Sequence, residues 1–191
     1  MIKILKSKSK DFNKLYIIPN VITYSNMILG AIAIFISIIG NRHNLKIASL
    51  LIITAGVMDK LDGYIARKLN IASKFGKELD SLCDLVSFGI APVILWWNIN
   101  TGKLGLIEMI GSIIFIGAGI FRLAKFNITK DQGYIIGLPI TIAGMIMAIK
   151  HFIDISYRIG NRDYMINLEN LLLMFLLSLF MISKFRIKKP L

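Results

Sequence analysis

Residues 59–84 read DKLDGYIARKLNIASKFGKELDSLCD, and this stretch joins the end of one long apolar run to the beginning of the next. Asp59 and Asp62 are three residues apart, and Asp80 and Asp84 are four apart. Residues at these spacings lie on one face of a helix, about one turn from each other. If the two runs form neighbouring antiparallel helices, four carboxylates meet at one end of the pair.

The composition indicates that the solvent of this chain is a bilayer. Apolar residues make up 55% of the 191 residues, and the mean hydropathy is +0.68. A helix needs about 20 apolar residues to cross roughly 30 Å of hydrocarbon. The sequence therefore predicts an all-α integral membrane protein with six transmembrane helices, at about 20–40, 47–67, 78–99, 104–126, 134–154 and 165–184.

The distribution of positive charge predicts the orientation of these helices. Six crossings place both termini on one side, and Lys and Arg accumulate in short cytoplasmic loops. Of the 23 basic residues, most fall on the side of the termini, and the opposite side holds Arg42, Lys46, Lys103, Lys150, Arg158 and Arg162. We therefore expect a multi-pass protein of the cell membrane, with a basic juxtamembrane arm (1–19), one catalytic domain (20–184), a basic cytoplasmic tail (185–191) and a site near the cytoplasmic face.

The four aspartates predict a metal site. Carboxylates at membrane depth are tolerated mainly where they face a polar cavity, pair with cations or bind ions. Oxygen ligands without a His or Cys cluster favour Mg²⁺ or Mn²⁺, and two ions would balance four carboxylates. Arg67 and nearby lysines would then supply positive charge to a diphosphate.

Small and polar residues accompany the aspartates. Gly63 and Ala66 follow the first pair and Gly76 precedes the second, which would leave room for a phosphate or nucleotide close to the backbone. At the start of the first span, three polar residues recur at three-residue spacing and share one face. Either these residues bind the cytosine or ribose of a nucleotide, or they bond between helices: Asn20, Thr23 and Asn26.

Residues 59–84 fit the pattern D-x2-D-G-x2-A-R-x8-G-x3-D-x3-D at every position, and this pattern resembles the signature of the CDP-alcohol phosphatidyltransferase family. The resemblance implies six transmembrane helices, usually in a homodimer, and displacement of CMP from a CDP-linked lipid by an alcohol. It further implies that Asp59, Asp62, Asp80 and Asp84 are metal ligands and that Asp84 is also the general base. The nucleotide-side positions would be Gly63, Ala66, Arg67 and Gly76.

Three further segments are similar to the branch of that family whose acceptor is L-serine. They are LDSLCDLVSFGIAP at 79–92, FRLAKFN at 121–127 and GLPIT at 137–141. Serine has a carboxylate that needs a cation, and Arg122 and Lys125 are the candidates, unless they only mark the membrane boundary. Ser87 and Asn127 are further candidates for the acceptor site.

Other readings of the sequence stay open. The same metal motif would serve an acceptor such as glycerol 3-phosphate or inositol phosphate, and the lipid donor would be either CDP-diacylglycerol or CDP-archaeol. A membrane cation transporter would also carry carboxylates, but along a pathway that reaches both faces. The charge of +12 flanks apolar spans and lacks interleaved aromatic residues, which indicates membrane lipid and not nucleic acid as the partner.

Overall fold

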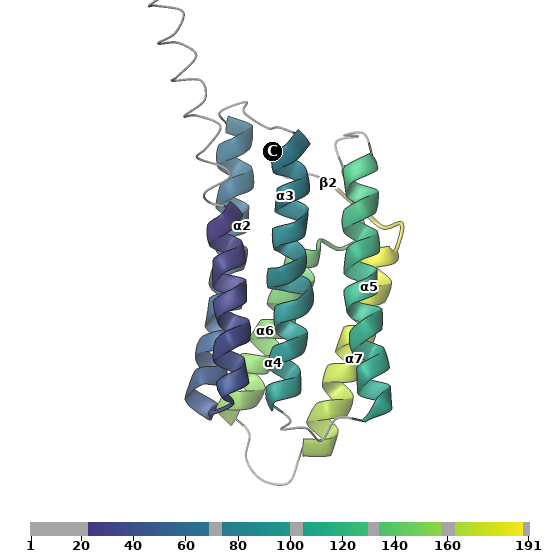
Figure 1. The fold of residues 1–191 in the computed structure, drawn as a ribbon. Helices are drawn as coiled ribbons and strands as arrows, with labels where there is room; N and C mark the ends of the chain where they lie inside the picture. Colours follow the sequence, from purple (N-terminus) through teal and green to yellow (C-terminus); the bar gives the residue numbers. More distant parts are fainter. Residues whose placement is uncertain (1–22, 69–73, 100–104, 130–133, 158–162, 189–191) are drawn as a thin grey trace, which may run out of the picture.

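The computed structural model of the protein describes residues 23–68, 74–99, 105–129, 134–157 and 163–188, with the side chains at 62, 65–68, 134–135, 163–164, 166 and 186–188 outside this description. The predicted arm at 1–19 also lies outside the described residues. The described chain is a bundle of long helices that stand side by side (Figure 1).

The first described helix is Thr23–Ile39. The elements that follow are α2 (Arg42–Lys68), α3 (Lys74–Asp84), the π-helical segment η1 (Leu85–Ile90), α4 (Ala91–Ile99), α5 (Leu106–Ile128), β1 (Tyr134–Ile136), α6 (Ile140–Tyr157), α7 (Asp163–Ile182) and β2 (Arg186–Lys188). Because α3, η1 and α4 form one continuous helix, Lys74–Ile99, each of the six predicted spans corresponds to one long helical segment.

Three of these helices are long and apolar enough to cross a membrane: Lys74–Ile99, Leu106–Ile128 and Ile140–Tyr157. Thr23–Ile39 and Asn167–Ile182 are apolar but shorter in the described chain. Helix α2 has the length, but charged residues such as Asp59 and Lys60 interrupt its apolar character near its end. The helical fold is therefore confirmed, and the number of crossings stays a prediction.

The first helix turns directly into α2 at Gly40 and Asn41. Gly40 has a φ of 76°, a left-handed conformation that commonly ends helices and that glycine adopts without steric cost. The side-chain oxygen of Asn41 then accepts a hydrogen bond of 2.8 Å from the backbone N–H of Asn44, which satisfies a free donor of the first turn of α2. This short connection makes the two helices antiparallel neighbours.

Large apolar side chains fill the interior of the bundle and also lie on its outer surface. Phe88, Trp96 and Phe115 are completely buried between the helices. On the outside, Phe35 is 70% exposed and Leu172 is 60% exposed. An outer surface rich in exposed Ile, Leu and Phe suits contact with lipid chains, whereas a water-soluble protein of this size rarely exposes so much of it.

The helix that carries two of the aspartates changes its hydrogen-bond register directly after Asp84. The N–H of Ala91 bonds to the carbonyl oxygen of Val86, five residues back. Pro92, which we expect to kink this helix, follows at once and cannot donate a backbone hydrogen bond. The widened turn contacts α2, α5 and α6, so that η1 lies where the helices of the bundle meet.

Gly144 of α6 packs directly on η1, and we expect Gly144→Ala to destabilise the fold. An added Cβ would lie 2.6 Å from Cβ of Phe88 and 2.7 Å from its Cα and carbonyl oxygen. Such overpacking against backbone costs about 1–3 kcal/mol. Thermal unfolding in detergent should show a lower Tm. Gly117→Ala is the control, because no atom lies within 4 Å of its added Cβ; equal Tm values for both variants would contradict the packing.

A short antiparallel sheet interrupts the otherwise helical fold and was not predicted. Strand β1 pairs with β2, with Ile135 opposite Ile187. The N–H of Gly137 also bonds to the carbonyl oxygen of Phe185 at 2.8 Å. As a result, residues 134–136 of the fifth predicted span are strand, and α6 begins only after Pro139, a residue type that suits a helix start. Residues 186–188 of the predicted tail are the partner strand.

Candidate functional site

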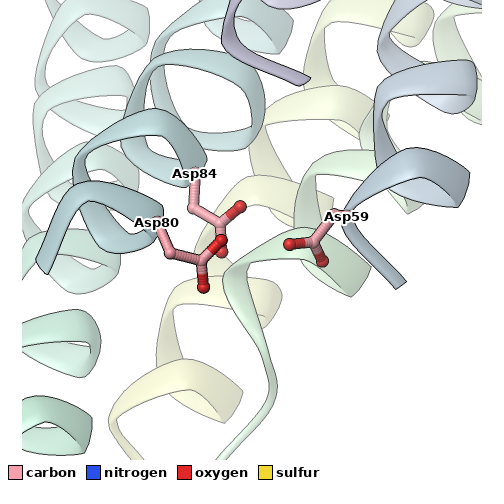
Figure 2. A group of neighbouring side chains, drawn as sticks. All are labelled: Asp59, Asp80 and Asp84. Carbon is pink, nitrogen blue, oxygen red and sulfur yellow. The ribbon is translucent and has the colours of Figure 1, made fainter. Parts of the chain in front are cut away.

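Three of the four aspartates converge between α2 and α3. Asp59 projects from α2, and Asp80 and Asp84 project from α3 toward it (Figure 2). One carboxylate oxygen from each lies within 4.8 Å of the others. Asp84 is 6% exposed, and the other two are half-buried. The antiparallel arrangement that the spacing predicts is therefore present in the structure.

Several predicted site residues cannot be placed by their side chains. Asp62, Ala66 and Arg67 lie on the backbone of α2, but their side chains are outside the described part of the chain. Asn20 is outside the described residues altogether. Their roles stay predictions that rest on the sequence, with Asp62 one helical turn beyond Asp59.

Two side chains from distant parts of the chain hold the carboxylate of Asp84. The amide Nδ2 of Asn26 donates to Oδ1 at 3.2 Å, and the hydroxyl of Thr141 donates to Oδ2 at 3.5 Å. The Thr141 hydroxyl also reaches Asp59. Ser87 donates in turn to the backbone oxygen of Asn26 at 3.1 Å. Together these contacts fix the orientation of Asp84.

These contacts bear on two predicted site residues, Asn26 and Ser87. Asn26 and Ser87 are completely buried, and Thr23 is 4% exposed. Asn26 bonds Asp84 on another helix, which is the interhelical alternative that the sequence left open. Ser87 donates to Asn26, and the nucleotide role of Asn26 and the acceptor role of Ser87 stay predictions. Thr141 was missed as a site residue, although it ends the GLPIT segment. Only that segment gave a signal for it, because nothing local links position 141 to position 84.

Arg122 is a buried cation whose charge acts on the aspartates. It projects from α5, is 8% exposed, and its charge acts on both Asp84 and Asp59. Its Nε has no hydrogen-bond partner among the described residues. Lys125, the second candidate, is only half-buried, and no contact within the described chain joins it to the carboxylates. The geometry therefore favours Arg122 over Lys125.

Asn127, another acceptor candidate, belongs to a network that links α5 to α3. Its Nδ2 lies 2.9 Å from Oε2 of Glu78 and 3.0 Å from Oγ of Ser81. Lys77, one turn before Ser81, donates to the backbone oxygens of Phe126 and Asn127 at 3.0 and 3.2 Å. Asn127 therefore bonds to α3 through Lys77, Glu78 and Ser81, and its role at the acceptor stays a prediction.

The surroundings of the carboxylates fit divalent cations and an anionic ligand. Metal-binding groups in proteins are formed mainly by His, Cys, Asp and Glu side chains. Among the described side chains of these four types, only the three aspartates lie close enough together to hold a metal ion. An oxygen-only donor set of this kind suits Mg²⁺ or Mn²⁺. Gly63, on the next turn of α2, has open space where a Cβ would be, and Gly76 is half-buried. A ligand can therefore approach the backbone of α2 at Gly63.

Comparison with known proteins agrees with this arrangement. The family model for CDP-alcohol phosphatidyltransferase matches residues 16–185. A CDP-diacylglycerol–serine O-phosphatidyltransferase of Helicobacter pylori is 36% identical over 179 residues, which cover 91% of this chain and 73% of the relative. The enzyme of the same name from Bacillus subtilis is 40% identical over 136 residues, 71% of this chain and 75% of the relative.

A third relative carries a different name. The archaetidylserine synthase of Methanothermobacter thermautotrophicus is 34% identical over 139 residues, which cover 71% of this chain and 58% of the relative. The family model, the length of the matches and the convergence of Asp59, Asp80 and Asp84 lead to one conclusion. The chain belongs to the CDP-alcohol phosphatidyltransferase family.

Proposed function

We propose that this protein transfers a phosphatidyl or archaetidyl group from a CDP-activated lipid to L-serine and releases CMP. The observation that carries the choice of acceptor is Arg122, a buried guanidinium whose charge acts on Asp59 and Asp84. A guanidinium binds a carboxylate with two parallel hydrogen bonds. The names of the relatives from bacteria and archaea support the same acceptor.

In this proposal Asp59, Asp62, Asp80 and Asp84 hold two divalent ions. When bound, Mg²⁺ or Mn²⁺ would neutralise the diphosphate of the donor and the charge that develops on the departing CMP. Arg67 contributes a further positive charge on the nucleotide side. Gly63, Ala66 and Gly76 leave room for the diphosphate and the ribose.

Asp84 accepts the proton of the serine hydroxyl. The deprotonated serine oxygen then attacks the lipid-side phosphorus of the diphosphate. The bond between that phosphorus and the bridging oxygen of the diphosphate breaks, and CMP leaves with the bridging oxygen. Asn26 and Thr141 keep the carboxylate of Asp84 in one orientation, which holds the accepting oxygen in place before the substrate arrives. Arg122 holds the serine carboxylate, so that the hydroxyl points toward Asp84.

The same proposal places the bundle in the cell membrane. We propose that all six helical segments cross, with the termini and the aspartates toward the cytoplasm. The charge bias of the loops supports this orientation. The exposed apolar side chains on the described helices support contact with lipid. The homodimer that the family resemblance implies remains a prediction.

Release of CMP by purified protein tests the proposed function. The protein would receive CDP-diacylglycerol or CDP-archaeol with Mn²⁺ or Mg²⁺, and either serine, glycerol 3-phosphate or inositol phosphate. We expect CMP only with serine, and none after the metal is removed with EDTA. Release with glycerol 3-phosphate but not with serine would show that the acceptor is wrong. Metal-dependent ion flux without any CMP would favour a transporter.

A further inference from the structure

Lys77 of α3 binds the end of the helix that carries Arg122. Its ammonium lies 3.0 Å from the backbone oxygen of Phe126 and 3.2 Å from that of Asn127. Both oxygens belong to the last turn of α5, where carbonyl groups lack partners within the helix. The negative end of the helix dipole also favours a cation at this position. Lys77 therefore fixes the end of α5 against α3.

Lys77 and Arg122 also share one aromatic ring. The ammonium of Lys77 lies 4.6 Å from the centre of the Phe126 ring, and the guanidinium carbon of Arg122 lies 5.4 Å from it. Both distances are within the range of cation–π attraction. Phe126 follows Arg122 by four residues on α5, the spacing at which helical side chains are neighbours. The Phe126 ring is therefore in contact with both Lys77 and Arg122.

Arg122 depends on such support. Its side chain is long, and ordering a long flexible side chain costs conformational entropy. No described residue accepts a hydrogen bond from its Nε, and the Phe126 ring is one of the groups that its guanidinium contacts.

The face of α3 that carries Lys77 also carries Asp80 and Asp84. Lys77, Ser81 and Asp84 lie at successive turns of α3. The hydroxyl of Ser81 donates to Oδ1 of Asn127 at 3.2 Å, which adds a second link to α5. Contacts at Lys77 and Ser81 therefore join the helix that carries Asp84 to the helix that carries Arg122.

We propose that Lys77 is a positioning residue for the acceptor, which acts through Phe126 and the end of α5 to hold Arg122 toward the serine carboxylate. This inference rests on the proposed function, because it takes Arg122 as the group that binds serine. Lys77 itself touches neither serine nor the donor. Its loss should therefore weaken serine binding more than it slows the reaction at saturating serine.

Lys77→Met tests this role, since it keeps the length of the side chain and removes the charge and the donors. We expect the KM for serine to rise about fivefold, consistent with the loss of one modest charged contact, with little change in kcat or in the KM for the CDP-lipid. Lys77→Arg, which keeps a cation and its donors, should restore most of the serine affinity. Lys74→Met is the matched control: it removes the same charge from an exposed position one turn earlier on α3 and should leave all three constants unchanged.

A double-variant cycle separates this inference from the proposed function. If Lys77 acts through Arg122, then Lys77→Met should add little to the serine KM in an Arg122→Gln background. An independent, multiplicative effect would overturn the positioning role, and so would a serine KM in Lys77→Met equal to that of the parent, whatever the value of kcat. If Arg122→Gln alone leaves the serine KM unchanged, the proposed role of Arg122 is wrong, whatever Lys77→Met does. A variant that folds poorly lowers the active fraction and hence the apparent kcat, but not the KM.

Discussion

Asp84→Asn is expected to lower the rate of CMP release by about a thousandfold or more. The substitution keeps the size of the side chain but removes both the negative charge that balances the ions and the oxygen that takes the proton of serine. General-base catalysis alone is worth about 10²–10⁴-fold, and the loss of a metal ligand adds to it. The rate can be measured directly as radiolabelled CMP released from a labelled CDP-lipid, or as labelled serine incorporated into lipid.

A loss of activity in this variant must be distinguished from a loss of folding, because Asp84 is buried and bonded to Asn26 and Thr141. The control is therefore the Tm of the variant. An asparagine at this position can still accept the hydrogen bond from Asn26 through its amide oxygen. We therefore expect the Tm of Asp84→Asn in detergent to be similar to or higher than that of the parent, since three crowded carboxylates repel one another without metal. Full activity in this variant would exclude Asp84 as the base.

Arg122→Gln should raise the KM for serine on the order of 10- to 100-fold. A hydrogen bond between charged groups contributes about 1.5–3 kcal/mol, and a factor of ten in affinity corresponds to about 1.4 kcal/mol. Glutamine keeps a donor but loses the charge and the paired geometry of the guanidinium. The KM for the CDP-lipid, measured at saturating serine, should change far less.

Lys125→Gln decides between the two cations that the sequence proposes for the acceptor. It removes the same charge from the same helix, one turn later, where no contact within the described chain reaches the carboxylates. We expect a change in serine KM of less than about threefold, the effect of a half-exposed charge. A large rise in this variant together with an unchanged KM in Arg122→Gln would transfer the acceptor role to Lys125.

The convergence of the aspartates could be predicted from the sequence, because it depends on local rules. The three- and four-residue spacings fix the face of each helix, and a short connection makes the two helices neighbours. These rules predicted that Asp59 meets Asp80 and Asp84, and the structure brings their oxygens within 4.8 Å of each other. The long apolar segments were predictable for the same reason, since helices satisfy their own backbone groups in lipid.

Contacts between distant parts of the chain could not be predicted in this way. Thr141 lies 57 residues from Asp84 along the sequence, and Lys77 lies 49 residues from Phe126. Both contacts depend on how the helices pack side by side, for which the sequence carries no periodic signal. The pairing of β1 with β2 is likewise a result of packing, because local propensity does not specify a strand partner. At η1 the sequence indicates a kink through Pro92, but it does not indicate that the kink takes the form of a widened turn.

The number of Mn²⁺ ions that bind per chain tests the central claim, that the aspartates form a two-metal centre. Purified protein would be titrated with Mn²⁺ in the presence of CDP, and free Mn²⁺ would be measured by electron paramagnetic resonance. We predict two ions per chain, and a loss of at least one in Asp80→Asn and in Asp84→Asn. Binding of no ion, or equal binding to the parent and to both variants, would contradict the account.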